Sequence, residues 1–142
     1  MLKTALIAAA CLLAAPAFAE VHEVKMLSRG EAGTMVFEPN YVEIAPGDSV
    51  KFLAAQPGHN AETIDGMIPE GAEGFKGKLN EEIEVTLDVP GAYGVRCAPH
   101  FPMGMVMVIN VGGGEIPAEF LEGRIPAKAK ERFETAIAQA GM

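Results

Sequence analysis

Short runs of apolar or alternating residues, separated by turn residues, make up much of this 142-residue chain. Seven of these runs predict strands, at residues 21–27, 35–37, 41–44, 50–54, 83–89, 92–97 and 105–111. Pro46-Gly47 and Pro90-Gly91 are among the turns between them. In the run 83–89 apolar and polar residues alternate strictly, which is typical of a strand with one buried face. Many short strands at such spacing predict an all-β sandwich.

Two later segments depart from the strand pattern. Residues 66–80 are rich in glycine and lysine, show no clear period and predict a long connection. After three glycines at 112–114, Pro117 and Pro126 each stand where a helix can begin, because the first helical position tolerates proline. Helical spacing then places four apolar residues on one face, namely Ala129, Phe133, Ile137 and Ala140. Two C-terminal α-helices, one short and one longer, are therefore expected to pack against the sandwich.

Residues 1–19 have the features of a secretory signal peptide. They contain a basic residue, Lys3, an apolar stretch at 7–15, and small residues before the expected cleavage in front of Glu20. Cleavage there leaves residues 20–142, which have the usual size of a single domain. No later run approaches the roughly 20 apolar residues needed to span a bilayer. The sequence therefore predicts an exported, soluble protein with no membrane role.

Charge and cysteine content narrow the function further. The formal net charge is −8, so a general nucleic-acid role lacks an electrostatic basis. Cys11 lies in the predicted leader, so the mature chain keeps one cysteine, Cys97, in a compartment where thiols tend to oxidise. Such a thiol must be buried and inert, paired with another chain, catalytic, or bound to a metal.

The residues after Cys97 offer three kinds of metal donor on one predicted loop. A thiolate at Cys97, an imidazole at His100 and thioethers at Met103 and Met105 lie between two predicted strands. His59, in a distant predicted loop, offers a second imidazole. One cysteine, two histidines and a weak axial sulfur form the set that selects copper for electron transfer. The residues therefore predict one copper ion, with either methionine available as the axial ligand.

Other interpretations explain fewer of these residues. Structural zinc prefers four cysteine or histidine ligands and leaves the thioether unused. One cysteine cannot hold an iron–sulfur cluster, and the sequence has no Cys-x-x-Cys-His motif for covalent haem. An enzyme with Cys97 as nucleophile and His100 as base needs a third, orienting residue, and none is evident, so no catalytic residue is predicted. His22, near the expected mature N-terminus, is predicted to be solvated.

The loop from Cys97 to Met105 resembles the copper-binding loop of the cupredoxins, the blue-copper protein family. A resemblance to the pseudoazurins among them extends over nearly all of residues 20–142. It includes Gly58-His59-Asn60, the stretch MIPEGAE at 67–73 and the helical C-terminal extension. The resemblance implies a Greek-key sandwich and an electron carrier in the periplasm rather than an enzyme.

The resemblance also implies which residues hold the copper, namely His59, Cys97, His100 and Met105. It favours Met105 over Met103 as the axial ligand, and ligation by Met105 would fix the loop where the last predicted strand begins. Met103 is then expected to be an apolar loop residue near the site.

Two further residues are expected to support the ligand loops. Asn60 is expected to join the loops by hydrogen bonds, as its counterpart does in the family, and Pro99 should limit motion between Cys97 and His100. Ala98 stands where many relatives have threonine, which removes one possible hydroxyl contact. The tuning of the reduction potential is expected to differ for that reason.

A docking face is expected around the solvent-facing edge of His100. Its apolar part, the apolar collar, comprises Met35, Phe101, Pro102 and Met103. By resemblance a basic rim surrounds the collar, formed by Arg29, Lys76, Arg96 and Lys128. Pro57 departs from the lysine pattern of the relatives, so the rim should be weaker here.

The resemblance further implies partners among periplasmic redox proteins, such as nitrite reductase, nitrous oxide reductase and c-type cytochromes. No nucleic-acid or membrane partner is expected, and the chain is expected to be a monomer. The alternative function is copper storage or delivery, because the same ligands can serve it from a more exposed loop. Fast, reversible electron exchange would distinguish the carrier from the store.

Overall fold

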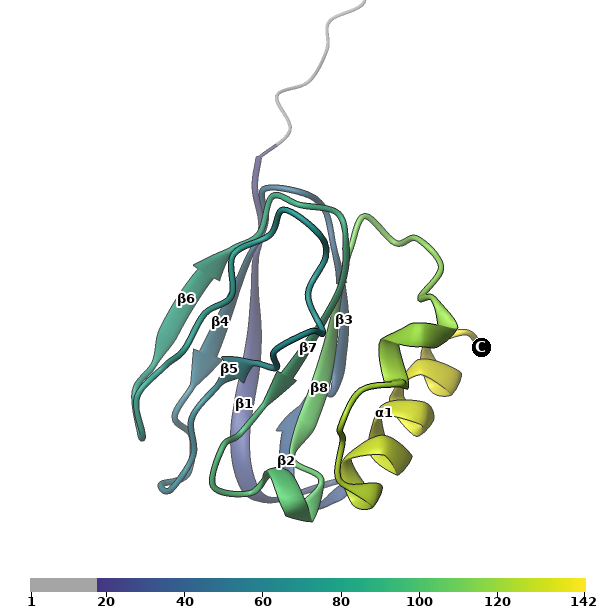
Figure 1. The fold of residues 1–142 in the computed structure, drawn as a ribbon. Helices are drawn as coiled ribbons and strands as arrows, with labels where there is room; N and C mark the ends of the chain where they lie inside the picture. Colours follow the sequence, from purple (N-terminus) through teal and green to yellow (C-terminus); the bar gives the residue numbers. More distant parts are fainter. Residues whose placement is uncertain (1–17) are drawn as a thin grey trace, which may run out of the picture.

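Eight strands in the described part of the chain form two packed sheets, with a helix on one outer face (Figure 1). The computed structural model describes residues 18–142, so the predicted signal peptide lies outside the described residues except for its last two positions. The strands are β1 (Val21–Gly30), β2 (Gly33–Glu38), β3 (Tyr41–Ile44), β4 (Ser49–Leu53), β5 (Glu62–Thr63), β6 (Ile83–Thr86), β7 (Gly91–Arg96) and β8 (Val106–Val111). Each of the seven predicted runs overlaps one strand, whereas β5, which has only two residues, was not predicted.

The sheets have the strand orders β2-β1-β4-β6 and β3-β8-β7-β5. Most neighbours are antiparallel, but β1 pairs with β4 and β3 pairs with β8 in parallel. Parallel neighbours cannot be joined by a tight hairpin, so the chain must cross between the sheets. The resulting sandwich confirms the all-β fold class expected from the sequence.

Apolar side chains from both sheets fill the space between them. The fully buried ones include Val24, Met26, Phe37, Val50, Phe52, Tyr93, Val95, Met107 and Ile109. Burying one such side chain stabilises the fold by roughly 1.5–3 kcal/mol. Because this core is shared by both sheets, it fixes the positions at which the loops leave the sandwich.

β8 is buried on both faces, which explains its continuous apolar sequence. Met107 and Ile109 belong to the core between the sheets, whereas Val106 and Val108 belong to a second cluster with Phe133 of the helix α1 (Ala127–Ala140). A strand covered on both sides has no solvent face and needs no polar alternation.

The C-terminal segment differs from the prediction in its first helix. The residues after Pro117 form a 3₁₀ turn, η2 (Ala118–Leu121), in place of a short α-helix. Gly123 follows almost at once, and glycine disfavours continuation of a helix. The turn still packs by Phe120, whose ring centroid lies 5.9 Å from that of Phe133.

The longer helix, α1, begins directly after Pro126, as predicted. Ala129 and Phe133 are buried, but the third buried position is Ala136, and Ala140 is exposed at the end of the helix. The apolar face is thus shorter than the sequence pattern indicated. Within residues 18–142, no helix has the length and apolarity required to cross a membrane.

The two ends of the sandwich differ in chemistry. The chain enters β1 at one end, and the 3₁₀ turn η1 (Phe101–Met103) lies at the other (Figure 1). At the entry end His22 Nε2 lies 3.0 Å from Asp48 Oδ2, and the Glu20 N–H donates to Asp48 Oδ1 at 2.9 Å. These contacts, first the one from Glu20 and then the one from His22, lower the pKa of Asp48. His22, which was predicted to be solvated, is partly exposed, and its ring is bonded to the buried carboxylate of Asp48.

Candidate metal centre

Two loops at the η1 end carry the four predicted copper ligands. His59 lies between β4 and β5, and Cys97, His100 and Met105 lie between β7 and β8. Backbone bonds close the second loop: the Cys97 N–H donates to Met105 O at 3.0 Å, and the Met105 N–H donates to His100 O at 3.1 Å. Gly104 ends η1 and turns the chain toward β8. Its φ of 86° lies in the left-handed region, which glycine adopts readily.

The donors of His59, Cys97 and His100 converge. Cys97 Sγ lies 3.7 Å from His59 Nδ1 and 3.5 Å from His100 Nδ1, and the two Nδ1 atoms are 3.1 Å apart. The point equidistant from these three atoms lies about 2 Å from each, close to the roughly 2.0–2.3 Å at which imidazole and thiolate bind a metal such as zinc. The three groups therefore fit a metal ion without rearrangement, and two nitrogens with one sulfur suit copper.

Burial distinguishes the two methionines of the loop. Met105 is fully buried in the core cluster that also contains Cys97, whereas Met103 is 47% exposed. Cys97 and His59 are buried, and His100 is partly exposed. The protein therefore covers Cys97, His59 and Met105, while His100 reaches solvent.

Burial also shifts the proton affinities of two donors. It raises the pKa of the Cys97 thiol, and the Glu62 carboxylate adds to this, while the backbone N–H groups of Asn60 and His100 oppose it. Burial lowers the pKa of His59, with a contribution from nearby His100. A cation at the centre would compensate the thiolate charge that burial disfavours.

A serine fixes the ring of His59 from behind. Ser28 Oγ lies 2.9 Å from His59 Nε2, which leaves Nδ1 directed at Cys97. The Ser28 backbone is held in turn by Gln56 Oε1, which accepts its N–H at 2.7 Å. Metal-binding imidazoles commonly use their second nitrogen in this way. Ser28 and Gln56 were not predicted from the sequence, because neither belongs to a recognisable motif.

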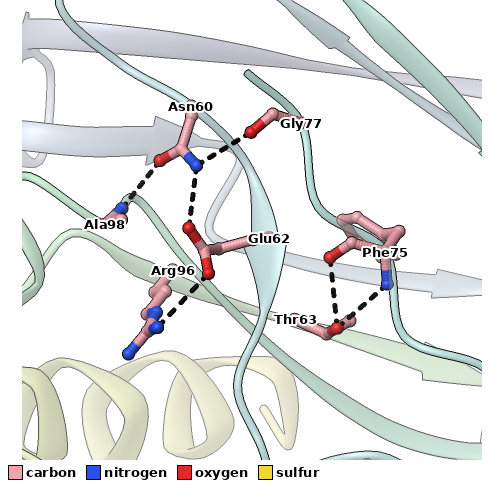
Figure 2. Close-up of polar contacts among 7 residues, drawn as sticks. All are labelled: Asn60, Glu62, Thr63, Phe75, Gly77, Arg96 and Ala98. Carbon is pink, nitrogen blue, oxygen red and sulfur yellow. Dashed lines mark hydrogen bonds and ion pairs between the residues drawn. The ribbon is translucent and has the colours of Figure 1, made fainter. Parts of the chain in front are cut away.

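Asn60, which was expected to support both ligand loops, lies between them. Its Oδ1 accepts the Ala98 N–H at 2.7 Å, and its Nδ2 donates to Gly77 O at 3.1 Å and to Glu62 Oε1 at 2.9 Å (Figure 2). Pro99, the other expected support, is exposed beside Ala98. The contact with Glu62 was not predicted from the sequence.

The apolar collar lies partly on η1, directly after His100. Pro102 and Met103 are exposed, Phe101 is partly buried, and Met35 of β2 is partly buried against the core. The structure therefore offers exposed apolar atoms next to the histidine that reaches solvent.

Two residues of the basic rim already have acidic neighbours. Arg96 Nη2 lies 3.2 Å from Glu62 Oε2, and Lys128 Nζ lies 3.0 Å from Glu131 Oε1. Arg29 and Lys76 are exposed and take part in no ion pair among residues 18–142. The positive charge of the rim is therefore least compensated at these two positions.

Arg132 of α1, which was also not predicted from the sequence, links the collar to the ligand loop. Its Nη1 donates to Met35 O at 2.6 Å and to Gly104 O at 3.2 Å, and its Nη2 donates to Thr34 O at 2.8 Å. Met35 has a φ of 52°, which is uncommon for a residue other than glycine. Arg132 thus anchors an unusual backbone position and the residue before Met105 at the same time.

Comparisons with known proteins agree with this site. A family of copper binding proteins, the plastocyanin/azurin family, matches residues 24–112. The chain is 47% identical over 133 residues to a pseudoazurin from Paracoccus pantotrophus, covering 93% of this chain and 92% of that protein. A crystal structure of pseudoazurin from Methylobacterium extorquens AM1 matches with a TM-score of 0.79 and 41% identity, covering 84% of this chain and 98% of the other. One from Hyphomicrobium denitrificans matches with a TM-score of 0.75 and 36% identity, covering 84% and 97%.

A two-sheet sandwich with a cysteine and two histidines converging at one end defines a cupredoxin, and the chain belongs to the plastocyanin/azurin family of copper-binding proteins. This family membership and the converging donors confirm the cofactor predicted from the sequence, which is one copper ion. The particular family is the pseudoazurins, which the similarity over most of the chain identifies.

Proposed function

We propose that this chain is an exported blue-copper electron carrier that holds one copper ion through His59, Cys97, His100 and Met105. The observation that carries the proposal is the triangle of His59 Nδ1, His100 Nδ1 and Cys97 Sγ, whose sides of 3.1–3.7 Å suit a single ion. The burial of Met105, in contrast to the exposure of Met103, supports Met105 as the axial ligand. Bound copper supplies a one-electron couple, and this ligand set is typical of electron transfer.

The task of the protein in this function is to keep the donors in place in both oxidation states. Ser28 orients the ring of His59, and Asn60 ties its loop to the Cys97 loop. Buried surroundings exclude water from Cys97, and the partly exposed His100 connects the donor set to the surface. The apolar collar next to His100 suits a small, transient contact with a redox partner.

Two other functions are less well supported. Copper storage or delivery requires the ion to leave, and the burial of His59, Cys97 and Met105 disfavours release. A nucleophilic role for Cys97 requires an accessible thiolate, whereas this thiol is buried and its pKa is raised by that burial.

The cellular setting belongs to the same proposal. The leader-like sequence 1–19 supports export, cleavage before Glu20 and a single mature domain of residues 20–142 in the periplasm. The partners we propose are periplasmic redox proteins, such as nitrite reductase, nitrous oxide reductase or c-type cytochromes, with the chain acting as a monomer.

Addition of cupric ion to the purified mature chain tests the function. An intense visible band from a thiolate–copper bond should appear, together with a reversible one-electron wave in voltammetry. Cys97→Ser should abolish the band and leave at most a weak, ordinary copper centre. A band that persists in Cys97→Ser would refute the assignment, and a wild-type band without reversible electron exchange would favour storage.

A further inference from the structure

Glu62 is a buried carboxylate that the copper chemistry proposed above does not use. It belongs to β5, three residues after His59, and its side chain is only 8% exposed. Burying a charge costs free energy unless the charge is paired and hydrogen-bonded. Each of its oxygens has its own partner: Oε1 accepts from Asn60 Nδ2 at 2.9 Å, and Oε2 accepts from Arg96 Nη2 at 3.2 Å (Figure 2).

The Glu62 carboxylate and the Gly77 carbonyl together decide which way the Asn60 amide faces. An ionised carboxylate and a backbone carbonyl can only accept hydrogen bonds, so the NH₂ group of Asn60 must face them. The Asn60 oxygen is then directed at the Ala98 N–H, which it accepts at 2.7 Å. Ala98 directly follows Cys97, so this bond joins the His59 loop to the Cys97 loop. Without Glu62, the Asn60 NH₂ group keeps only Gly77 O, at 3.1 Å, as an acceptor, and an amide turned by 180° would present a donor to the Ala98 N–H.

Arg96 continues the network to the docking surface. Its guanidinium carbon lies 5.0 Å from the centroid of the Phe101 ring, in the apolar collar, and its side chain is 33% exposed. Its Nε is buried and has no hydrogen-bond partner among the described residues. A continuous set of contacts therefore runs from the residue after Cys97 through Asn60, Glu62 and Arg96 to the surface beside His100.

We propose that Glu62 is a positioning residue for electron transfer. It orients the Asn60 amide, which bonds one ligand loop to the other, and it places a negative charge near Cys97. This inference rests on the proposed copper function. Because a nearby negative charge stabilises the more positive oxidation state, Glu62 lowers the reduction potential of the site, and the positive charge of Arg96 partly offsets it. The same charge raises the pKa of the Cys97 thiol, after the larger effect of burial.

Charge-removing variants of the copper-loaded protein test the electrostatic part. Glu62→Gln keeps the shape and the acceptor for Asn60 but removes the charge, so the reduction potential should rise. Because a charge a few ångströms from the centre interacts with it by more than the thermal energy in a buried environment, the oxidised-to-reduced ratio at fixed potential should change about threefold or more. Arg96→Gln should move the potential in the opposite direction. The exposed residues Glu84 and Arg124, each changed to Gln, provide matched controls and should have little effect.

Proton exchange in the metal-free protein tests the positioning part independently of copper. In Glu62→Ala, the Ala98 amide and the Asn60 side-chain NH₂ should exchange about tenfold faster or more than in the wild type, because Gly77 O is then the one acceptor left to hold the Asn60 orientation. In Glu62→Gln they should stay close to the wild type, because the replacement amide still offers an acceptor.

The two arms separate failure of this inference from failure of the proposed function. Absence of the visible band in the copper-treated wild type would refute the proposed copper function. The exchange experiment, which uses the metal-free protein, would still test the positioning role. Equal potentials in Glu62→Gln and wild type, or a shift in the same direction for Glu62→Gln and Arg96→Gln, would overturn the electrostatic role. Unchanged exchange at Ala98 in Glu62→Ala would overturn the positioning role.

Discussion

Single side chains behind the donors determine the geometry of this site. The ring of His59 can direct only one nitrogen at the centre, and Ser28 Oγ, 2.9 Å from Nε2, leaves Nδ1 for that purpose. The amide of Asn60 has two chemically different ends, and Glu62 and Ala98 occupy the matching sides. The donors are therefore oriented before any ion binds, which reduces the reorganisation that electron transfer would require.

The identity of the axial ligand can be tested with two conservative substitutions. Met105→Leu should raise the reduction potential and change the visible spectrum, because it removes a thioether that donates to cupric copper while nearly conserving volume. Met103→Leu is the matched control and should leave both nearly unchanged, because Met103 is 47% exposed. Voltammetry and absorption spectra of the two copper-loaded variants provide the measurement. The reverse result would identify Met103 as the ligand.

Only part of this site could be predicted from the sequence. Cys97, His100 and the loop methionines lie within nine residues, so their chemistry is visible as a motif. Ser28 and Glu62 have no such signal, because a serine in a strand or a glutamate in a polar stretch is usually solvated. Their roles arise only when β1 and β5 bring them next to His59 and Asn60.

Strands and helices were easier to predict where the pattern is long. β1, β7 and β8 follow from apolar runs, whereas the two-residue β5 is too short to produce a period. The segment after Pro117 was expected to be helical but forms only the turn η2, because few residues precede the glycine that follows. The helix α1 was expected to cover the sandwich, and its contact with the ligand loop through Arg132 was not expected.

Replacement of Arg132 tests whether α1 holds the copper loop as well as covering the core. Arg132→Gln removes the fork that donates to Met35, Gly104 and Thr34, so the free energy of unfolding of the metal-free protein should fall by about 1–3 kcal/mol. Lys130→Gln, exposed on the same helix, is the control and should change it by less than about 0.5 kcal/mol. Urea unfolding of both variants at equal m-value gives the comparison. Equal stability of the two variants would rule out a stabilising role for the Arg132 hydrogen bonds.

Charge is distributed unevenly over the whole molecule. The formal net charge is −8, yet Arg29 and Lys76 are exposed and lack ion pairs among residues 18–142. Lys76 lines an open groove together with Asn60, Ala98 and Pro99, next to the ligand loops. The entry end of the sandwich instead holds the cluster of Glu20, His22 and Asp48. Net charge alone would therefore mislead about the partner that the copper end accepts.

Reversal of single rim charges tests whether this local positive charge guides association. With a reductase that presents an acidic patch, Lys76→Glu should slow association by about tenfold, because complementary charges mainly raise the association rate. Lys128→Glu should have a smaller effect, because Glu131 lies 3.0 Å from its Nζ and already compensates part of its charge. Lys51→Glu, which changes the net charge equally but lies in β4 opposite Glu23 of β1, is the control.

Stopped-flow rates should fall for the wild type as salt shortens the screening length to about 8–10 Å, while the visible spectrum stays the same in all variants. A wild-type rate that is flat or rises with salt would exclude the basic rim for that partner and leave the apolar collar as its docking surface.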